Sequence, residues 1–331
     1  DPLSPHRRNP SVTRRLYSLL WLRVLRPSVR LAARQTTRWL LWSEDILSQT
    51  SYVLRLSCPD RVGVVATVTS HLASRGANIL EAHHFLDTVS NRSVMRIVFE
   101  TSGQPIDESA FSREFGAAMQ PLGIEWSLRD QADKVRVVIA VSKHGHCLSS
   151  LLHRWSTDTL PINIVAVVSN HEEQRRLTEW HGLPFHHLPI TPGRKEEQER
   201  RMLDLFAASR GELLVLARYM QVLTSAACRE LKDQAINIHH SFLPGFKGAK
   251  PYHQAYQRGV KLIGATAHYV NEDLDEGPII EQAVERVDHT LSPDQLTTIG
   301  NEIESVVLNR AVQWHAESRV FEFGNRTVVL R

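Results

Sequence analysis

Three residue types that can handle protons and oxyanions occur together in the second half of the chain. Asn237 and His239 lie in NIHHSFLPGF, at the end of a short apolar strand pattern and just before a predicted proline-glycine turn, and Asp275 lies in the turn NEDLDEGPII. Residues two apart on a strand point to the same face, so the amide and the imidazole should be neighbours. With a carboxylate they could stabilise an oxyanion and move protons at a carbonyl carbon. The alternative interpretation is a capped loop with surface acids and packed histidines.

Residues 132–331 contain the strand and helix signals that must position these groups. Nearly continuous apolar strands such as KVRVVIAVS, INIVAVVSN and AINIHH alternate with helical stretches such as HEEQRRLTEWHG. This order predicts a doubly wound, mostly parallel α/β sheet, in which sites form beyond the carboxyl ends of strands. AINIHH brings Asn237 and His239 to that edge, while His240 should point the other way and have a wall or packing role. A long helix and a hairpin turning at Gly324-Asn325 close the pattern.

Residues 50–131 form a separate unit of βαββαβ order. Strand patterns at 51–58, 77–87, 91–100 and 124–130 are separated by helical patterns at 59–76 and 107–123. This order predicts a ferredoxin-like sandwich, with both helices on one face of an antiparallel sheet. The chain is therefore expected to have two α/β domains, at 50–131 and 132–331.

Composition excludes several classes of function. The chain of 331 residues carries a formal charge of +3, but nine arginines and only three acids lie in its first 49 residues. The remainder is slightly acidic, which argues against nucleic acid as a partner. Cys58, Cys147 and Cys228 form no CxxC pair, so a reducing compartment is expected. No apolar run approaches the ~18–20 residues that a membrane span needs, so no membrane association is expected.

Residues 1–49 are arginine-rich and have no acid between Pro2 and Ser43. Such a segment is typical of a basic disordered tail, of upstream sequence read from a misplaced start, or of a mitochondrial presequence. We expect a cytoplasmic protein, with a mitochondrial location as the alternative if this segment is a presequence.

The first unit resembles the ACT domain, a regulatory module that commonly binds amino acids where two copies meet. The stretch that carries the resemblance is CPDRVGVVATVTSHLASRGANILEAHHF. The resemblance implies a homo-oligomer and an amino-acid effector such as glycine or methionine. Asp60, Gly63 and Asn78 are the candidate regulatory residues, although Gly63 and Asn78 also suit ordinary turns in a domain that only dimerises.

The second unit resembles the folate-dependent formyltransferase fold. The resemblance rests on NIHHSFLPGFKGAKPYHQAYQRGVKLIGATAHYVNEDLDEGPIIEQ and extends over about residues 134–315. It implies that Asn237, His239 and Asp275 form a catalytic triad, and that His268 orients Asp275 or is merely packed. It also implies a folate pocket built from ARYMQVL and the Asp275 loop, with candidate substrate-binding residues Met220, Val222, Leu223 and Gly277. Met220 and Leu223 could instead be ordinary core residues.

Three features indicate a hydrolase branch of this fold. The ACT unit occurs in formyltetrahydrofolate deformylases, and the loop SKHGHCLSS has only Gly145 where ribonucleotide transferases have a phosphate-binding loop. A tRNA-binding C-terminal domain is not expected. The resemblance therefore implies hydrolysis of 10-formyltetrahydrofolate to tetrahydrofolate and formate, with no cofactor and no metal. The alternatives are a formyltransferase acting on an amine and a catalytically idle folate and amino-acid sensor.

Overall fold

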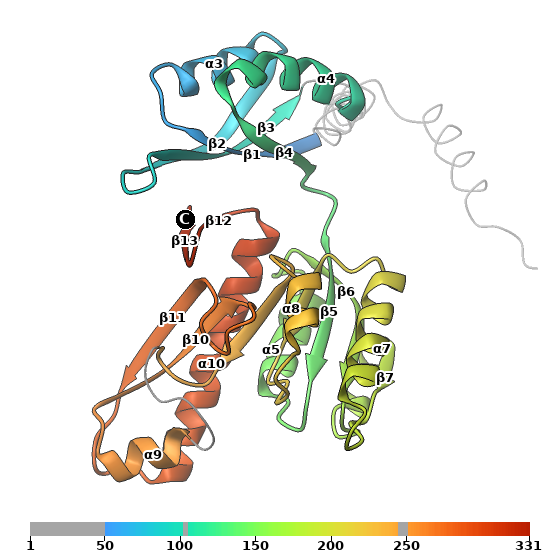
Figure 1. Cartoon of the computed structure of the whole chain (residues 1–331), viewed down its shortest axis with the longest axis vertical. Coiled ribbons are helices and arrows are strands. Elements are labelled where there is room, and N and C mark those ends of the chain that lie inside the picture. Colours follow the sequence, from blue (N-terminus) through green and yellow to red (C-terminus); the bar gives the residue numbers. More distant parts are fainter. Residues whose placement is uncertain (1–49, 102–104, 244–250) are drawn as a thin grey trace, which may run out of the picture.

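The computed structural model describes residues 50–101, 105–243 and 251–331, which form two α/β units (Figure 1). A single segment, between residues 130 and 135, leads from the first unit into the second. The arginine-rich segment 1–49, with its interpretation as a tail or presequence, lies outside the described residues, as does the turn predicted at Pro244-Gly245.

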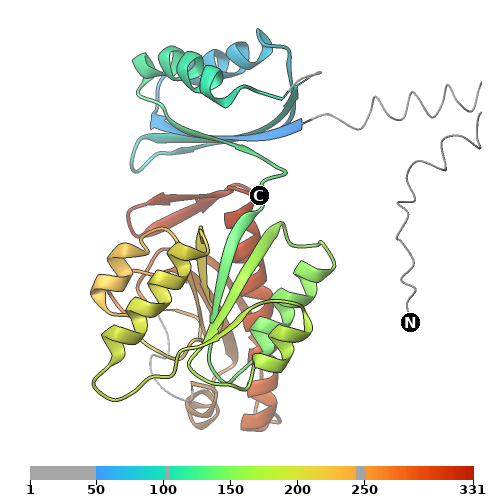
Figure 2. The same ribbon diagram turned by 90° about the vertical axis from the view of Figure 1, so that its right-hand side faces the viewer.

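The first unit is a four-stranded antiparallel sheet in the order β2-β3-β1-β4. Figure 2 shows both helices on the same face of this sheet, which confirms the ferredoxin-like prediction. The elements are β1 (Thr50–Pro59), α3 (Val64–Ala73), β2 (Ala77–Asp87), β3 (Arg92–Thr101), α4 (Glu108–Met119), the 3-10 turn η2 (Gln120–Leu122) and β4 (Glu125–Asp130).

The helices of this unit are shorter than their sequence patterns predict. The first pattern covers 59–76, but α3 begins only after Gly63, whose φ of 91° is left-handed and ends the preceding turn. The second pattern covers 107–123, but α4 gives way to a 3-10 turn at Pro121, which lacks a backbone N–H. Phe111 of α4 stacks on Phe99 of β3 with centroids 6.5 Å apart, and Phe115 packs edge-on against Trp126 of β4 at 5.0 Å, so these rings fix α4 on the sheet.

The second unit has a nine-stranded sheet in the order β12-β13-β11-β10-β9-β8-β5-β6-β7. Neighbours from β9 to β7 are parallel, whereas β10 is antiparallel to both β9 and β11. The strands are β5 (Val135–Val141), β6 (Ile162–Ser169), β7 (Phe185–His187), β8 (Leu213–Leu216), β9 (Ala235–His239), β10 (Leu262–Tyr269), β11 (Ile279–Arg286), β12 (Val320–Phe323) and β13 (Arg326–Val329). The mostly parallel sheet predicted from the sequence is confirmed.

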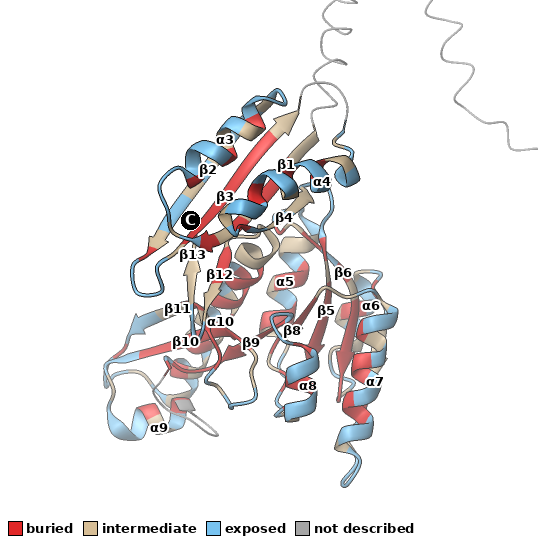
Figure 3. Cartoon of the chain, turned by 45° about the horizontal axis from the view of Figure 1, so that its top comes forward, coloured by how far each residue is buried: buried red, intermediate tan, exposed pale blue. Residues whose placement is uncertain are grey.

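Helices cover both faces of this sheet. They are α5 (His146–Ser156), α6 (Arg175–Trp180), α7 (Lys195–Ala208), α8 (Ser225–Glu230), α9 (Pro251–Arg258) and α10 (Pro293–Ala316). Alternate residues of β5 enter two separate cores, since Val137 and Ile139 pack with α5 and α10 while Val138 and Ala140 pack with α7 and α8. The central strands are accordingly buried on both faces (Figure 3).

Two helices of this unit differ from the sequence pattern. The pattern at 171–182 forms a helix only at α6, six residues long. The sequence pattern does not predict α8, because six residues are too few for a periodic signal. The hydroxyl of Thr224 caps α8 by accepting from the backbone N–H of Ala227 at 3.3 Å.

The two units are joined by a hairpin of β12 and β13, which lies beneath the first sheet in Figure 1. Phe321 and Leu330 share one buried cluster with Val94 of β3. The guanidinium of Arg96 is 2% exposed, ion-pairs with Glu81 at 2.8 Å and donates to the backbone carbonyl of Glu317 at 2.7 Å. The second unit therefore covers the sheet face that carries no helices.

Candidate active site

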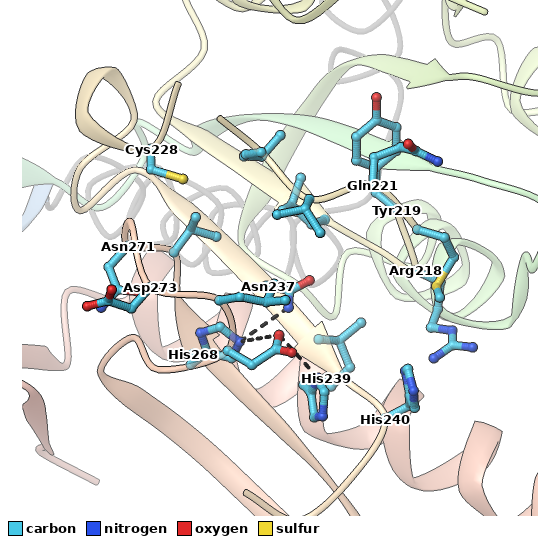
Figure 4. Close-up of a pocket in the computed structure, with 18 of the residues that line it drawn as sticks. Arg218, Tyr219, Gln221, Cys228, Asn237, His239, His240, His268, Asn271 and Asp273 are labelled. Atoms are coloured by element: carbon cyan, nitrogen blue, oxygen red, sulfur yellow. Dashed lines mark hydrogen bonds and ion pairs between the residues drawn. The ribbon is translucent and has the colours of Figure 1, made fainter. Parts of the chain in front are cut away.

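The end of β9 lies between β8 and β10, at the carboxyl edge of the parallel strands. Antiparallel pairing with β10 sets His268 opposite Asn237. The Asn237 side-chain amide donates to His268 Nε2 at 3.2 Å, and His239 Nδ1 lies 3.1 Å from Asp275 Oδ1 (Figure 4). The structure thus brings the amide, the imidazole and the carboxylate of the sequence prediction into one cluster.

Asp275 is held in an unusual backbone conformation. Its φ of 58° lies in the left-handed region, which aspartate tolerates better than most residues and which is frequent at functional turns. Burial acts to raise the pKa of Asp275, but its contacts with His239 and His268 outweigh burial and hold that pKa well below the usual range. Asp275 is therefore a carboxylate at neutral pH.

His268 is fixed from two sides. Its Nδ1 donates to the carbonyl oxygen of Tyr269 at 2.8 Å, so its Nε2 accepts the proton of the Asn237 amide. That Nε2 also lies 3.8 Å from Asp275 Oδ1, beside the carboxylate but too far for a hydrogen bond. His268 is 3% exposed, so it is both packed and placed beside the carboxylate.

A cavity of about 290 Å³ opens on this cluster. It is lined by the segment after β8, by the end of β9 and by the loop after β10. Met220 and Val222 are half exposed, whereas Leu223 is buried; all three line the cavity. This apolar wall is of the kind expected for a flat heterocyclic ring.

Gly277 is not among the residues that line this cavity. A Cβ at this position would lie 1.8 Å from the carbonyl oxygen of Tyr269 and 3.1 Å from His268 Nδ1. Its glycine lets the Asp275 loop approach the backbone that holds His268. The structure therefore gives Gly277 a place behind the site instead of in the predicted substrate pocket.

His240 lines the wall of the cavity, one of the two roles expected for it, but the prediction that it points away from His239 is wrong. Strand β9 ends at His239, so the alternation of side chains does not continue to His240. The two rings stack with centroids 5.0 Å apart, and both line the cavity. The sequence placed ARYMQVL and the Asp275 loop at the pocket but did not single out six other polar residues of the lining: Arg218, Tyr219, Gln221, Asn271, Glu272 and Asp273. ARYMQVL follows the buried strand β8 at the edge where sites form, a signal that could have singled out its polar side chains as well as its apolar ones.

One group in the described part of the chain has the residue types of a metal site. The ligand atoms of His146, Cys147 and Glu304 lie within 4.8 Å of one another. However, the Glu304 carboxylate already accepts from Tyr252 at 2.6 Å and lies 3.4 Å from the Arg218 guanidinium, which would repel a cation. Burial also raises the pKa of the Cys147 thiol, which disfavours the thiolate that a metal binds.

The three candidate regulatory residues are not brought together within one chain. Asp60 follows β1 and accepts from the Ser93 hydroxyl at 2.5 Å, and Gly63 caps α3 nearby. Asn78 pairs with Glu100 at 2.8 Å, at the other end of β3. Ser93 and Glu100 are seven residues apart on β3, which corresponds to about 24 Å, so these residues cannot surround one small ligand in a single protomer.

The chain matches two family models. One, described as formyl transferase, matches residues 135–312, and the other, described as ACT domain, matches residues 52–111. The formyltetrahydrofolate deformylase of Corynebacterium sp. (strain P-1) is 48% identical over 283 residues, which cover 86% of this chain and 99% of the relative. The chain belongs to the formyltetrahydrofolate deformylase family.

Solved structures of this family have the same fold. The deformylase of Burkholderia mallei ATCC 23344 matches with a TM-score of 0.81 and 50% identity, covering 85% of this chain and all of that chain. Glycinamide ribonucleotide transformylase 1 of Symbiobacterium toebii matches with a TM-score of 0.56 and 27% identity, over 62% of this chain and 98% of that one. The predictions of a deformylase, a hydrolase with an ACT domain and a formyltransferase fold, are confirmed. In the described residues of this deformylase, no helix is long and apolar enough to cross a membrane.

Proposed function

We propose that this cavity is where water hydrolyses 10-formyltetrahydrofolate, with Asp275 as general base. Water attacks the formyl carbon and loses a proton to Asp275. The bond from the formyl carbon to N10 then breaks, N10 takes a proton, and tetrahydrofolate and formate are released. Asp275 is placed to receive the proton because it is ionised at neutral pH and lines the cavity beside His239.

The observation that carries this proposal is the state of the His239 ring. Its Nδ1 lies 3.1 Å from Asp275, while its buried Nε2 has no hydrogen-bond partner among the described residues. Buried polar atoms are rarely left unpaired, so this nitrogen is expected to meet a partner during the reaction. As imidazolium, His239 would donate through Nδ1 to Asp275 and through Nε2 to the oxyanion.

Asn237 would provide the second donor to the oxyanion. One N–H of its amide is directed at His268, which leaves the other available. His268 thereby fixes the orientation of the amide and stands beside Asp275. The apolar wall of Met220, Val222 and Leu223 would hold the pteridine ring, so that the formyl group meets the polar cluster.

The loop before α5 favours water over a phosphorylated amine as the acceptor of the formyl group. The side-chain amide of Gln174 lies over Gly145, where an added Cβ would meet Gln174 Oε1, and it donates to the Lys143 carbonyl at 2.6 Å. This arrangement covers the backbone that a phosphate-binding loop would expose. It therefore supports the hydrolase over a transferase acting on a ribonucleotide.

Regulation and assembly are proposed from the ACT domain. An amino acid such as glycine or methionine is the proposed effector, and a homo-oligomer is the proposed assembly, because Asp60, Gly63 and Asn78 could share a ligand only across two chains. Sedimentation with and without these amino acids tests both statements. A cytoplasmic location remains an expectation, with the mitochondrion as the alternative.

Hydrolysis is tested by supplying purified protein with 10-formyltetrahydrofolate and no acceptor. We expect stoichiometric formate and tetrahydrofolate, and a loss of about 100- to 1000-fold in kcat for His239→Ala or Asp275→Ala. His153→Ala, an exposed histidine of α5, is the matched control. Turnover near the wild-type rate in either site variant would refute the catalytic assignment of that residue. Binding without turnover would favour the sensor, and dependence on an amine would favour the transferase.

A further inference from the structure

Arg218 lies at the edge of the cavity without a full set of partners. It lies two residues after the end of β8, has a left-handed φ of 62°, and its side chain is only 11% exposed. Among the described residues, neither Nε nor Nη1 has a hydrogen-bond partner, although both atoms are buried. Figure 4 shows its guanidinium directed toward His240, on the side of His239 away from His268.

A buried carboxylate holds this guanidinium in place. Glu304 of α10 is fully buried, and its Oε2 lies 3.4 Å from Arg218 Nε and 2.8 Å from His146 Nε2. Tyr252 donates to the other carboxylate oxygen at 2.6 Å. Burial acts to raise the pKa of Glu304, but the hydrogen bond from His146 and the charge of Arg218 outweigh it and lower that pKa. An ionised Glu304 therefore balances the charge of Arg218 on one side. The rest of the Arg218 guanidinium remains available to a group in the cavity.

A guanidinium placed in this way requires an acceptor. Unpaired buried donors are costly, and the planar fork of arginine matches the two oxygens of a carboxylate. Glu304 contacts the fork on one side only, at a distance longer than an ideal charge-assisted hydrogen bond. The unused donor Nη1 is therefore the expected contact for a small planar anion that enters the cavity.

We propose that Arg218, beside His240, forms a carboxylate subsite that binds formate as it leaves the reaction. This inference rests on the proposed hydrolysis, because that reaction makes a carboxylate whereas formyl transfer to an amine does not. Attack of water and breakage of the bond to N10 convert the neutral formyl group into formate and release one proton. Arg218 receives the negative charge that appears in this step, and Glu304 keeps its fork oriented.

The folate substrate is a second source of carboxylate, through its glutamate tail. The position of Arg218 favours formate, because its side chain is almost entirely buried and shares the polar end of the cavity with His239 and His240. A flexible glutamate tail is expected at the solvent-facing mouth instead. The experiment below separates the two sources.

The test compares the wild-type protein with Arg218→Lys. Lysine keeps a positive charge beside Glu304, so the buried carboxylate is not left unpaired, but it loses the bidentate fork. Labelled formate is titrated into the protein bound to tetrahydrofolate and followed by NMR, which needs no turnover. The double variant Arg218→Gln/Glu304→Gln removes both charges together and serves if Arg218→Lys does not fold. Arg200→Gln, at an exposed arginine of α7, is the control.

We expect formate affinity to fall about 10- to 100-fold in the Arg218 variants and to stay unchanged in Arg200→Gln. The affinity for tetrahydrofolate alone should change less than about twofold. Equal formate affinity in wild type and variant, or no formate binding by the wild type, overturns the proposal. A parallel loss of tetrahydrofolate affinity assigns Arg218 to the glutamate tail instead. A separate measurement shows whether the hydrolysis proposal itself has failed: in that case His239→Ala would keep its turnover of 10-formyltetrahydrofolate.

Discussion

Gly277→Ala gives the sharpest test of how the site is positioned. The added methyl carbon would lie 1.8 Å from the Tyr269 carbonyl oxygen, whereas real Cβ contacts below 3.0 Å are essentially unknown. The Asp275 loop and the end of β10 must therefore separate by about 1 Å or more to restore van der Waals contact. The same carbonyl accepts the hydrogen bond of His268 Nδ1 at 2.8 Å, so this movement would disturb the residue that orients Asn237.

A displacement of about 1 Å in a catalytic group can reduce the rate about 100-fold. We expect a loss of that order in kcat for Gly277→Ala, because the polar cluster moves. The KM for 10-formyltetrahydrofolate should change much less, because Met220, Val222 and Leu223 lie on a different segment. Overpacking should also lower the free energy of unfolding by about 1–3 kcal/mol.

Steady-state formation of tetrahydrofolate and thermal unfolding are the two measurements. Gly116→Ala on α4 is the matched control, because its Cβ would make only an ordinary contact of 3.8 Å with Trp126. It should keep full activity and gain up to about 1 kcal/mol from helix propensity. If Gly277→Ala unfolds at a lower temperature but keeps kcat, the link from this glycine to His268 is refuted. If neither quantity changes, the predicted collision itself is wrong.

Two further predictions follow from buried titratable groups. Burial, and after it the neighbouring carboxylate of Asp233, raises the pKa of Glu322 from 4.5 to about 7. The folded protein therefore holds the Glu322 proton more tightly than the unfolded chain does. As a result, the free energy of unfolding falls as the pH rises from about 4.5 to about 7. Glu322→Gln should thus be more stable than wild type by about 1 kcal/mol at pH 8, after allowance for solvent screening, with the difference shrinking toward pH 5; identical melting temperatures across this range would contradict the reasoning. Burial raises the pKa of the Cys147 thiol, and all three cysteines are free and buried, so mass spectrometry should find no alkylation by iodoacetamide in the native protein and three adducts after unfolding. Rapid labelling of native Cys147 would show that its surroundings open.

Sequence reasoning located the catalytic candidates because local rules govern them. Asn237 and His239 share a face, since β9 continues through both residues, and the Asp275 turn follows the next strand. The same rule gave the wrong direction for His240, which lies one residue beyond the end of the strand. Strand alternation is therefore informative only as far as the ladder of hydrogen bonds extends.

The parts that could not be predicted depend on contacts between distant residues. The ion pair of Arg218 with Glu304 joins the segment after β8 to α10, and no sequence period links the two. The antiparallel direction of β10, which sets His268 opposite Asn237, depends on the path of the chain between β9 and β10. Gly277 was assigned to the pocket by its neighbours in sequence, whereas its packing against Tyr269 is visible only in three dimensions.

The hairpin beneath the first sheet has a consequence for biosynthesis. The ACT domain leaves the ribosome first, but the residues that cover its helix-free face, including Phe321, are made about 190 residues later. At ~5–20 residues per second, this delay is about 10–40 s, during which Val94 and the guanidinium of Arg96 face water or a chaperone. The helix-free face of the ACT domain is therefore covered only after the end of the second domain has been synthesised.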